Sequence, residues 1–125
     1  MLSRKLGDKK ATLVFAFTFI GISFSGHAAS TEGEYLPVPS DLKAKYYVID
    51  RGTRDGMPTV TTKRIGPSGT SYSRRVFDCS NGTGKYIGDG DTLRQMHNSR
   101  QDPKMYEMVT GSISWYVYQY ACQRR

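Results

Sequence analysis

The sequence contains few of the side chains on which most catalytic and metal sites depend. Its 125 residues include two cysteines, Cys79 and Cys122, and two histidines, of which only His97 follows residue 28. The cysteines form no Cys-x-x-Cys motif, which argues against a redox pair, and one histidine argues against a zinc site. A Ser or Cys nucleophile needs a neighbouring base, and His97 lies in a polar segment that we expect to be exposed. We therefore predict a protein that is not an enzyme and binds no cofactor or metal.

Paired carboxylates offer another route to catalysis. Asp89 and Asp91 stand two residues apart in a glycine-rich segment, where carboxylates can perform acid–base chemistry or provide oxygen ligands for calcium. Calcium needs about six or more ligands, however, and the rest of the loop pattern is missing. A solvated turn is the favoured interpretation, and a small hydrolase using Asp89 or Asp91 is the least favoured functional hypothesis.

Long hydrophobic runs are also missing, with one exception near the start of the chain. Residues 11–24 carry no charge, but a helix of that length rises about 21 Å, less than the roughly 30 Å of a bilayer core. Basic residues precede this run and small residues follow it, which is typical of a secretory signal peptide over residues 1–28. Cleavage after Ala28 is preferred to cleavage after Ala29, which would place the bulky His27 where a small residue is needed. An uncleaved membrane anchor or a buried core helix is the alternative.

Much of the positive charge belongs to this first segment. The full chain carries a formal net charge of +7, and residues 1–28 hold four basic residues and one acidic residue. The remainder has 14 Lys and Arg against 10 Asp and Glu, a net charge of +4. This mild surplus argues against nucleic acid as a partner. No second apolar run has spanning length, so we expect no membrane span after signal removal and a periplasmic or secreted product.

The two cysteines are expected to form a structural disulfide. About 97 residues follow the signal segment, enough for one domain with a modest core. Small exported domains often contain disulfides, because the compartments outside the cytoplasm preserve them. We predict that a Cys79–Cys122 bond ties the last helix to the sheet, with a redox pair or metal ligands as the alternatives. The loop between the cysteines is long, so the bond should contribute roughly 4 kcal/mol.

Segments rich in β-branched and aromatic residues follow a polar lead-in. Residues 29–44 contain two prolines and are expected to be flexible, so that a single domain spans residues 45–125. Asp55-Gly56 and Asn81-Gly82 are strong turn signals between the later segments. The predicted strands are residues 45–51, 59–65, 71–79 and 84–88, and alternation in the third places Phe77 and Cys79 on the core side.

The end of the chain changes to helical patterns. A short helix is expected from Leu93 to about Ser99. Alternation in residues 113–122 would suit a strand, whereas apolar residues at helical spacing suit a helix. Ser112 as an N-cap and the basic residues at the far end favour the helix. The predicted fold is α+β: a small antiparallel sheet of three to four strands, with a C-terminal helix packed on one face and one disulfide.

Arginine and tyrosine offer the best candidates for binding. The chain contains nine tyrosines, and four aromatic residues fall within residues 115–120, too many for one helix face to bury. We therefore expect Tyr118 to face outward. Arg and Tyr are favoured at the energetic centres of protein interfaces, and several arginines lie in or beside the predicted strands. The candidate partner-binding residues are Arg51, Arg64, Arg74 and Tyr118, with an ordinary solvated sheet face as the alternative.

Short motifs near the ends of the domain suggest a family. Phe77-Asp78-Cys79 closes a strand preceded by arginines, Gly111-Ser112-Ile113 opens the last helix, and Ala121-Cys122 lies near the terminus. Over residues 46–122 these motifs resemble the surface-adhesin protein E family of bacteria. The resemblance implies a small antiparallel sheet, a C-terminal helix and a Cys79–Cys122 link, and the named adhesin of that family binds host matrix and plasma proteins. The sequence departs from the family in lacking a lipoprotein cysteine after its signal, which favours the periplasm or secretion.

The leading functional hypothesis is an exported, non-enzymatic, adhesin-like bacterial protein that binds a protein partner. Its basis is the signal segment, the disulfide, the surplus of Arg and Tyr and the scarcity of catalytic groups. A periplasmic inhibitor or immunity protein, with a single hydrolase or toxin as its partner, is the alternative.

Overall fold

The computed structural model describes residues 31–123. The predicted signal peptide of residues 1–28 and its cleavage site at Ala28 or Ala29 lie outside the described residues. Between residues 31 and 123, no helix is long and apolar enough to cross a membrane.

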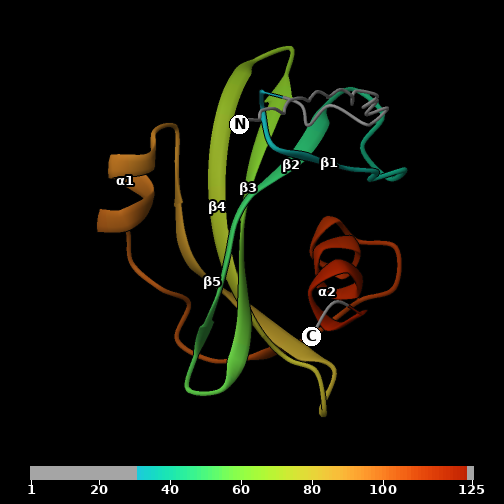
Figure 1. Ribbon diagram of the computed structural model, residues 1–125, viewed down its shortest axis with the longest axis vertical. Coiled ribbons are helices and arrows are strands. Elements are labelled where there is room, and N and C mark those ends of the chain that lie inside the picture. The colour runs from blue at the N-terminus through green and yellow to red at the C-terminus, as the bar shows by residue number, and fades with distance from the viewer. Residues whose placement is uncertain (1–30, 124–125) are drawn as a thin grey trace, which may run out of the picture.

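A six-stranded antiparallel sheet forms the body of the domain (Figure 1). Its strands follow one another in chain order, so each strand pairs with its sequence neighbours. Asp55 and Gly56, both with positive φ, form the turn between the second and third strands, as two-residue hairpins require. The strands are β1 (Glu34–Leu36), β2 (Lys45–Arg54), β3 (Met57–Gly66), β4 (Gly69–Asp78), β5 (Thr83–Gly90) and β6 (Tyr106–Glu107).

The α+β class is confirmed, but the sheet has six strands rather than three to four. The four predicted strands correspond to β2 to β5, and the two additional strands are the short ones at the edges. β1 lies inside the segment 29–44 that was expected to be a flexible lead-in. That expectation is wrong for the described part of the segment, because Leu36 and Val38 are buried in the core and hold the chain against the sheet.

The two helices lie on opposite sides of the sheet (Figure 1). α1 (Leu93–Asn98) packs its buried Met96 against Gly88 of β5, where an added Cβ would lie 2.6 Å from the Met96 carbonyl oxygen. α2 (Ile113–Gln123) covers the other face, which confirms the helix interpretation of residues 113–122. The main core lies beneath α2 and consists of Leu36, Val38, Tyr46, Val48, Val60, Phe77, Val117, Tyr120 and Ala121.

The predicted disulfide is also confirmed. Cys79, directly after β4, is bonded to Cys122 in the last turn of α2, with a Cα–Cα distance of 5.6 Å. The bond therefore ties the final helix to the sheet at the end of β4, as the sequence indicated.

Candidate functional site

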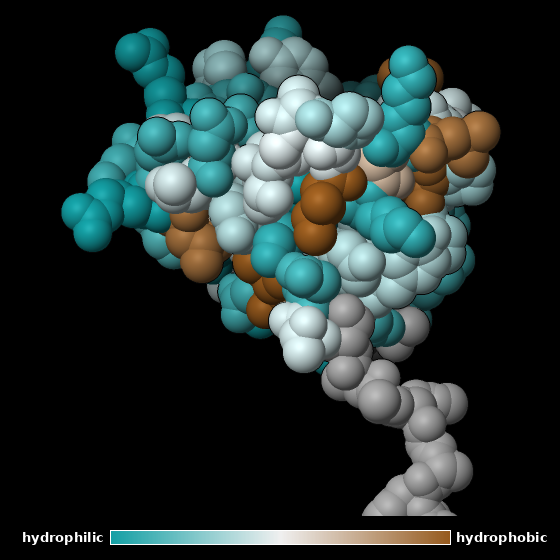
Figure 2. All heavy atoms as spheres, turned by 90° about the horizontal axis from the view of Figure 1, so that it is seen from above, coloured by the Kyte–Doolittle hydropathy of each residue, from teal (hydrophilic) through white to brown (hydrophobic). Residues whose placement is uncertain are grey.

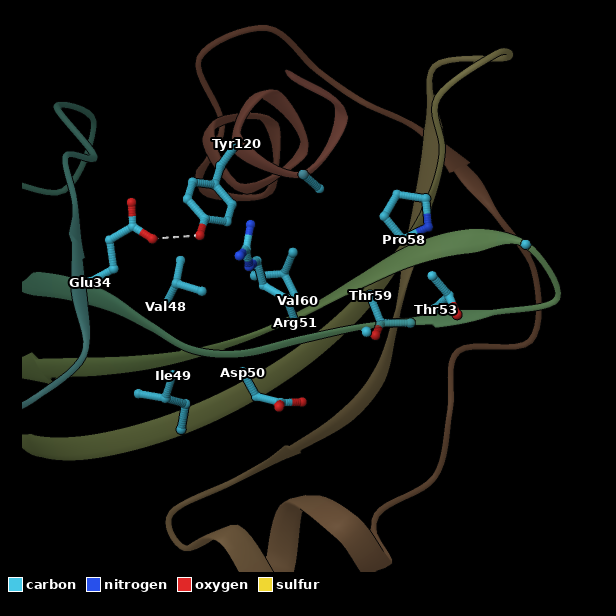
Figure 3. Close-up of a pocket in the computed structure, with 13 residues that line it drawn as sticks. Glu34, Val48, Ile49, Asp50, Arg51, Thr53, Pro58, Thr59, Val60 and Tyr120 are labelled. Atoms are coloured by element: carbon cyan, nitrogen blue, oxygen red, sulfur yellow. Dashed lines mark hydrogen bonds between the residues drawn. The ribbon is translucent and has the colours of Figure 1, made fainter. Parts of the chain in front are cut away.

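A groove of about 610 Å³ runs along the outer edge of β2 and beneath the last turns of α2 (Figure 3). β1 pairs with β2 only at residues 46–48, and β2 continues beyond that point to Arg54. The groove therefore follows the part of β2 that β1 leaves uncovered. Its lining residues are Glu34, Val48, Ile49, Asp50, Arg51, Gly52, Thr53, Gly56, Pro58, Thr59, Val60, Tyr120 and Ala121.

A β-bulge at Ile49 determines which side chains enter the groove. Val48 pairs with Thr62, but the next paired residue of β2 is Asp50, opposite Thr61, so Ile49 is the extra residue. The shifted register places Arg51 opposite Val60. In Figure 3, Arg51 accordingly points towards α2, whereas Ile49 and Asp50 point away from it.

The groove combines an apolar floor with an exposed cation. Val48, Val60 and Ala121 are buried side chains along its lining, and the Tyr120 hydroxyl donates a hydrogen bond of 2.7 Å to Glu34 Oε1. Arg51 is exposed, with its Cζ 6.0 Å from the Tyr120 ring centroid. Within residues 31–123 this guanidinium has no ion pair and no side-chain hydrogen bond. Arg51 is thus available to an acidic group that enters the groove.

The structure does not bring the four predicted partner-binding residues together. Arg51 lies at the groove, but Arg64 bonds to Asp41 elsewhere on the domain. Arg74 lies on the opposite face of the sheet from α2, and its buried Nε has no hydrogen-bond partner among the described residues. Tyr118 is half-buried and packs edge-on against Phe77 with ring centroids 5.8 Å apart, so it lies against the core and not fully outward as expected.

Arg64 is occupied by contacts within the fold. Its Nε donates to Asp41 Oδ2 at 3.0 Å and to the Tyr46 hydroxyl at 3.1 Å, and the Tyr46 hydroxyl donates to Asp41 at 2.8 Å. Burial, together with the hydrogen bond to Asp41, raises the pKa of Tyr46 to about 12. The same hydrogen bond lowers the pKa of Asp41, with further help from Arg64. This cluster anchors the loop before β2 and leaves Arg64 little freedom to bind a partner.

Another arginine, Arg75, is not among the predicted partner-binding residues and lies buried under the start of α2. Arg75 is only 3% exposed, and its guanidinium donates to the hydroxyls of Ser114, Thr62 and Tyr86 at 3.0, 3.1 and 2.8 Å. Its Cζ also lies 4.4 Å from the Tyr86 ring centroid. These contacts link β3, β4 and β5 to α2, which makes Arg75 a structural residue of the interior.

The residues considered for catalysis take part in local contacts. Asp89 accepts a hydrogen bond from Ser73 Oγ at 3.1 Å, and the Asp91 backbone N–H donates to Gln95 Oε1 at 2.8 Å. His97 is exposed on α1. Over residues 31–123, no group of three or more His, Cys, Asp or Glu side chains could hold a metal ion.

Glu34 and Tyr120 are groove residues that sequence reasoning missed. Glu34 lies in the segment 29–44 that the sequence predicts to be a flexible lead-in, and Tyr120 is one of several closely spaced aromatic residues of the last helix. The local sequence contains no signal for the contact of Tyr120 with Glu34, 86 positions away.

No protein-family model matches the sequence, and neither a curated protein nor a solved structure matches it significantly. The resemblance to the surface-adhesin protein E family therefore remains a prediction based on short motifs.

Proposed function

We propose that this protein is an exported, non-enzymatic bacterial binding protein that holds a protein partner in the groove along β2. The observation that supports the proposal most is the exposed Arg51 beside an apolar floor of Val48, Val60 and Ala121. Arginines beside apolar and aromatic surface are typical of the energetic centres of protein interfaces. The proposed location is the periplasm or the exterior, where the Cys79–Cys122 bond would persist.

The face seen in Figure 2 carries no single broad apolar patch, which is consistent with a local binding site. In Figure 2, apolar side chains form separate spots among polar atoms on the face that is shown. The groove is also of a size at which binding sites commonly occur, roughly 300–1,000 Å³. A partner that inserts one or two side chains and an acidic group would fit it.

The test is an affinity capture that uses the oxidised mature protein as bait. The bait is offered separately to a bacterial periplasmic extract and to host plasma and matrix proteins, at low and high salt. Arg51→Glu changes the groove, and Arg100→Glu makes the same charge change at another exposed position. We expect a partner that survives high salt, binds the Arg100→Glu control normally and is lost from Arg51→Glu.

The identity of the partner then separates the two functional classes. A host matrix or plasma protein would support the adhesin-like function, and a single periplasmic hydrolase or toxin would support the inhibitor or immunity alternative. Weak capture of many proteins that high salt abolishes would contradict the proposal, because screening would then have removed only a general attraction to the basic surface.

A further inference from the structure

Half of β2 is an open edge of the sheet. β1 pairs with Tyr46–Val48, and the following part of β2 pairs with β3 on its inner side only. Along residues 50–54, the outward backbone groups therefore have no ladder partner among the described residues. An unpaired strand edge of this kind is a template to which another extended segment can bond.

The start of β1 turns the chain away from this edge. Gly33 has φ of +125°, and an added Cβ would lie 2.6 Å from the Val48 carbonyl oxygen. Just before it, Glu32 forms an ion pair with Lys63, whose side chain lies on the sheet face opposite α2. Among the described residues, the β1–β2 ladder therefore ends at Glu34 opposite Val48, and β1 does not continue along Asp50–Arg54.

At the opposite edge of the sheet, the chain itself covers the outer strand β5. Beyond the short β6, the loop after α1 covers β5 with hydrogen bonds. The Asp102 N–H donates to the Tyr86 carbonyl at 3.0 Å, and the Tyr86 N–H donates to Asp102 Oδ2 at 3.2 Å. The Asp89 N–H donates to Ser99 Oγ at 2.8 Å. One edge is thus closed within the chain, while residues 50–54 receive no comparable cover from residues 31–123.

The charges on the open edge specify what could pair with it. Bulges and charges protect edges from flat apolar strands, and β2 has both. Asp50, Arg51 and Arg54 nevertheless have no ion pair among the described residues. A strand with complementary charges would therefore gain the ladder and the pairs, whereas an apolar strand would leave these charges without counter-charges.

We propose that the partner adds an extended segment to β2 at residues 50–54, antiparallel to it; this inference rests on the proposed binding function. In that pairing an acidic side chain lies opposite Arg51 and points into the groove, and a second lies opposite Arg54. A basic side chain lies opposite Asp50, and an aromatic one covers Gly52. Read from its N-terminus, the segment therefore runs from the residue opposite Arg54 to the residue opposite Asp50. Its five side chains in that order are acidic, β-branched, aromatic, acidic and basic.

The position of β1 limits the length of this segment. Glu34 begins β1 opposite Val48, so the added strand must end or turn away after the residue opposite Asp50. The Asp55-Gly56 turn ends β2 at the other end. The edge therefore takes about five residues, too few for a stable complex by backbone bonding alone, and the acidic contact with Arg51 provides additional affinity and selects the register.

A second copy of this chain fits the edge less well. Antiparallel pairing of β2 with itself about Gly52 would place Asp50 opposite Arg54, which is favourable. It would also place Gly52 opposite Gly52 and Arg51 opposite Thr53, so the centre would lack a cross-strand contact and Arg51 would lack an acid. A separate partner segment satisfies all of these positions.

The test uses a defined peptide and the oxidised mature protein. The probe is Ser-Gly-Glu-Val-Tyr-Glu-Lys-Gly-Ser, and binding is followed by NMR titration of the backbone amides. One control peptide exchanges each Glu for Lys and the Lys for Glu, and another carries N-methyl groups on alternate residues, which removes ladder donors. We expect the probe to bind at least tenfold more tightly than either control, with the largest amide shifts at residues 50–54.

Protein variants complete the test. Arg51→Glu should weaken the probe at least tenfold and favour the charge-exchanged peptide, while Arg100→Glu should leave the preference unchanged. Equal binding of the N-methylated peptide, shifts confined to other residues, or self-association through β2 would each overturn the inference. If capture of a partner still depends on Arg51 in that case, the binding function stands and only strand addition fails; if capture also fails, the proposed function fails with it.

Discussion

Removal of the Cys79–Cys122 disulfide tests how strongly the domain depends on its covalent link. The cysteines are 43 positions apart, so the bond closes a long loop that the unfolded chain would otherwise leave open. For a loop of this length, the chain-entropy relation gives about −13 cal/mol/K, or about 4 kcal/mol at room temperature. A small domain has a total stability of roughly 5–15 kcal/mol. The double variant Cys79→Ala/Cys122→Ala should therefore lose a large fraction of its stability.

Urea unfolding followed by the fluorescence of Trp115, the single tryptophan, measures this loss. Wild-type protein unfolded in the presence of reductant is the matched control, because it lacks the bond but retains both sulfur atoms. We expect the reduced wild type and the double variant to agree within about 1 kcal/mol, both well below the oxidised protein. A loss of less than about 1 kcal/mol would refute the reasoning, since α2 would then be held by its packing alone.

Three single substitutions test other parts of the structure. Arg75→Ala should cost about 3 kcal/mol in urea unfolding, because it removes a buried donor of three hydrogen bonds; a cost below 1 kcal/mol would contradict that role. Gly84→Ala should cost about 1–3 kcal/mol in the same assay, because the added Cβ would lie 2.5 Å from Phe77 Cδ1. An unchanged urea midpoint of unfolding would contradict this close packing. The pKa of Tyr46 is raised from 10.0 to about 12. The protonated hydroxyl therefore stabilises the fold fully below pH 10, and this stabilisation is lost as the pH rises towards 12. Between pH 10 and pH 12, the free energy of unfolding should therefore fall less in Tyr46→Phe than in wild type. Parallel pH profiles of this free energy in the two proteins would contradict the role of Tyr46.

The long elements could be predicted because their signals are local. β-branched and aromatic runs separated by Asp55-Gly56 and Asn81-Gly82 gave β2 to β5, and helical spacing gave α2. β1 and β6 could not be predicted in this way, because strands of two or three residues carry almost no periodicity. Their existence depends on the neighbours with which they pair and, for β1, on the burial of Leu36.

The candidate site was less predictable than the fold. Arg51, Arg64 and Arg74 look equivalent in the sequence, and tertiary contacts distinguish them. Arg64 is paired with Asp41, 23 positions away, and Arg74 lies on the other face. Arg51 reaches the groove because of the bulge at Ile49, and neither the bulge nor the distant partner of Arg64 has a signal in the neighbouring residues.

The disulfide and the groove are connected through the last turn of α2. Tyr120 and Ala121 line the groove, and Cys122 follows them directly, so the bond to Cys79 fixes the chain at the end of that wall. Helix ends fray most easily, and this end also provides the Tyr120 hydroxyl that holds Glu34 at the start of β1. Without the bond, the wall and the start of β1 would lose a shared support. We therefore expect the groove to keep its shape chiefly in oxidising compartments, which is where the proposed function places the protein.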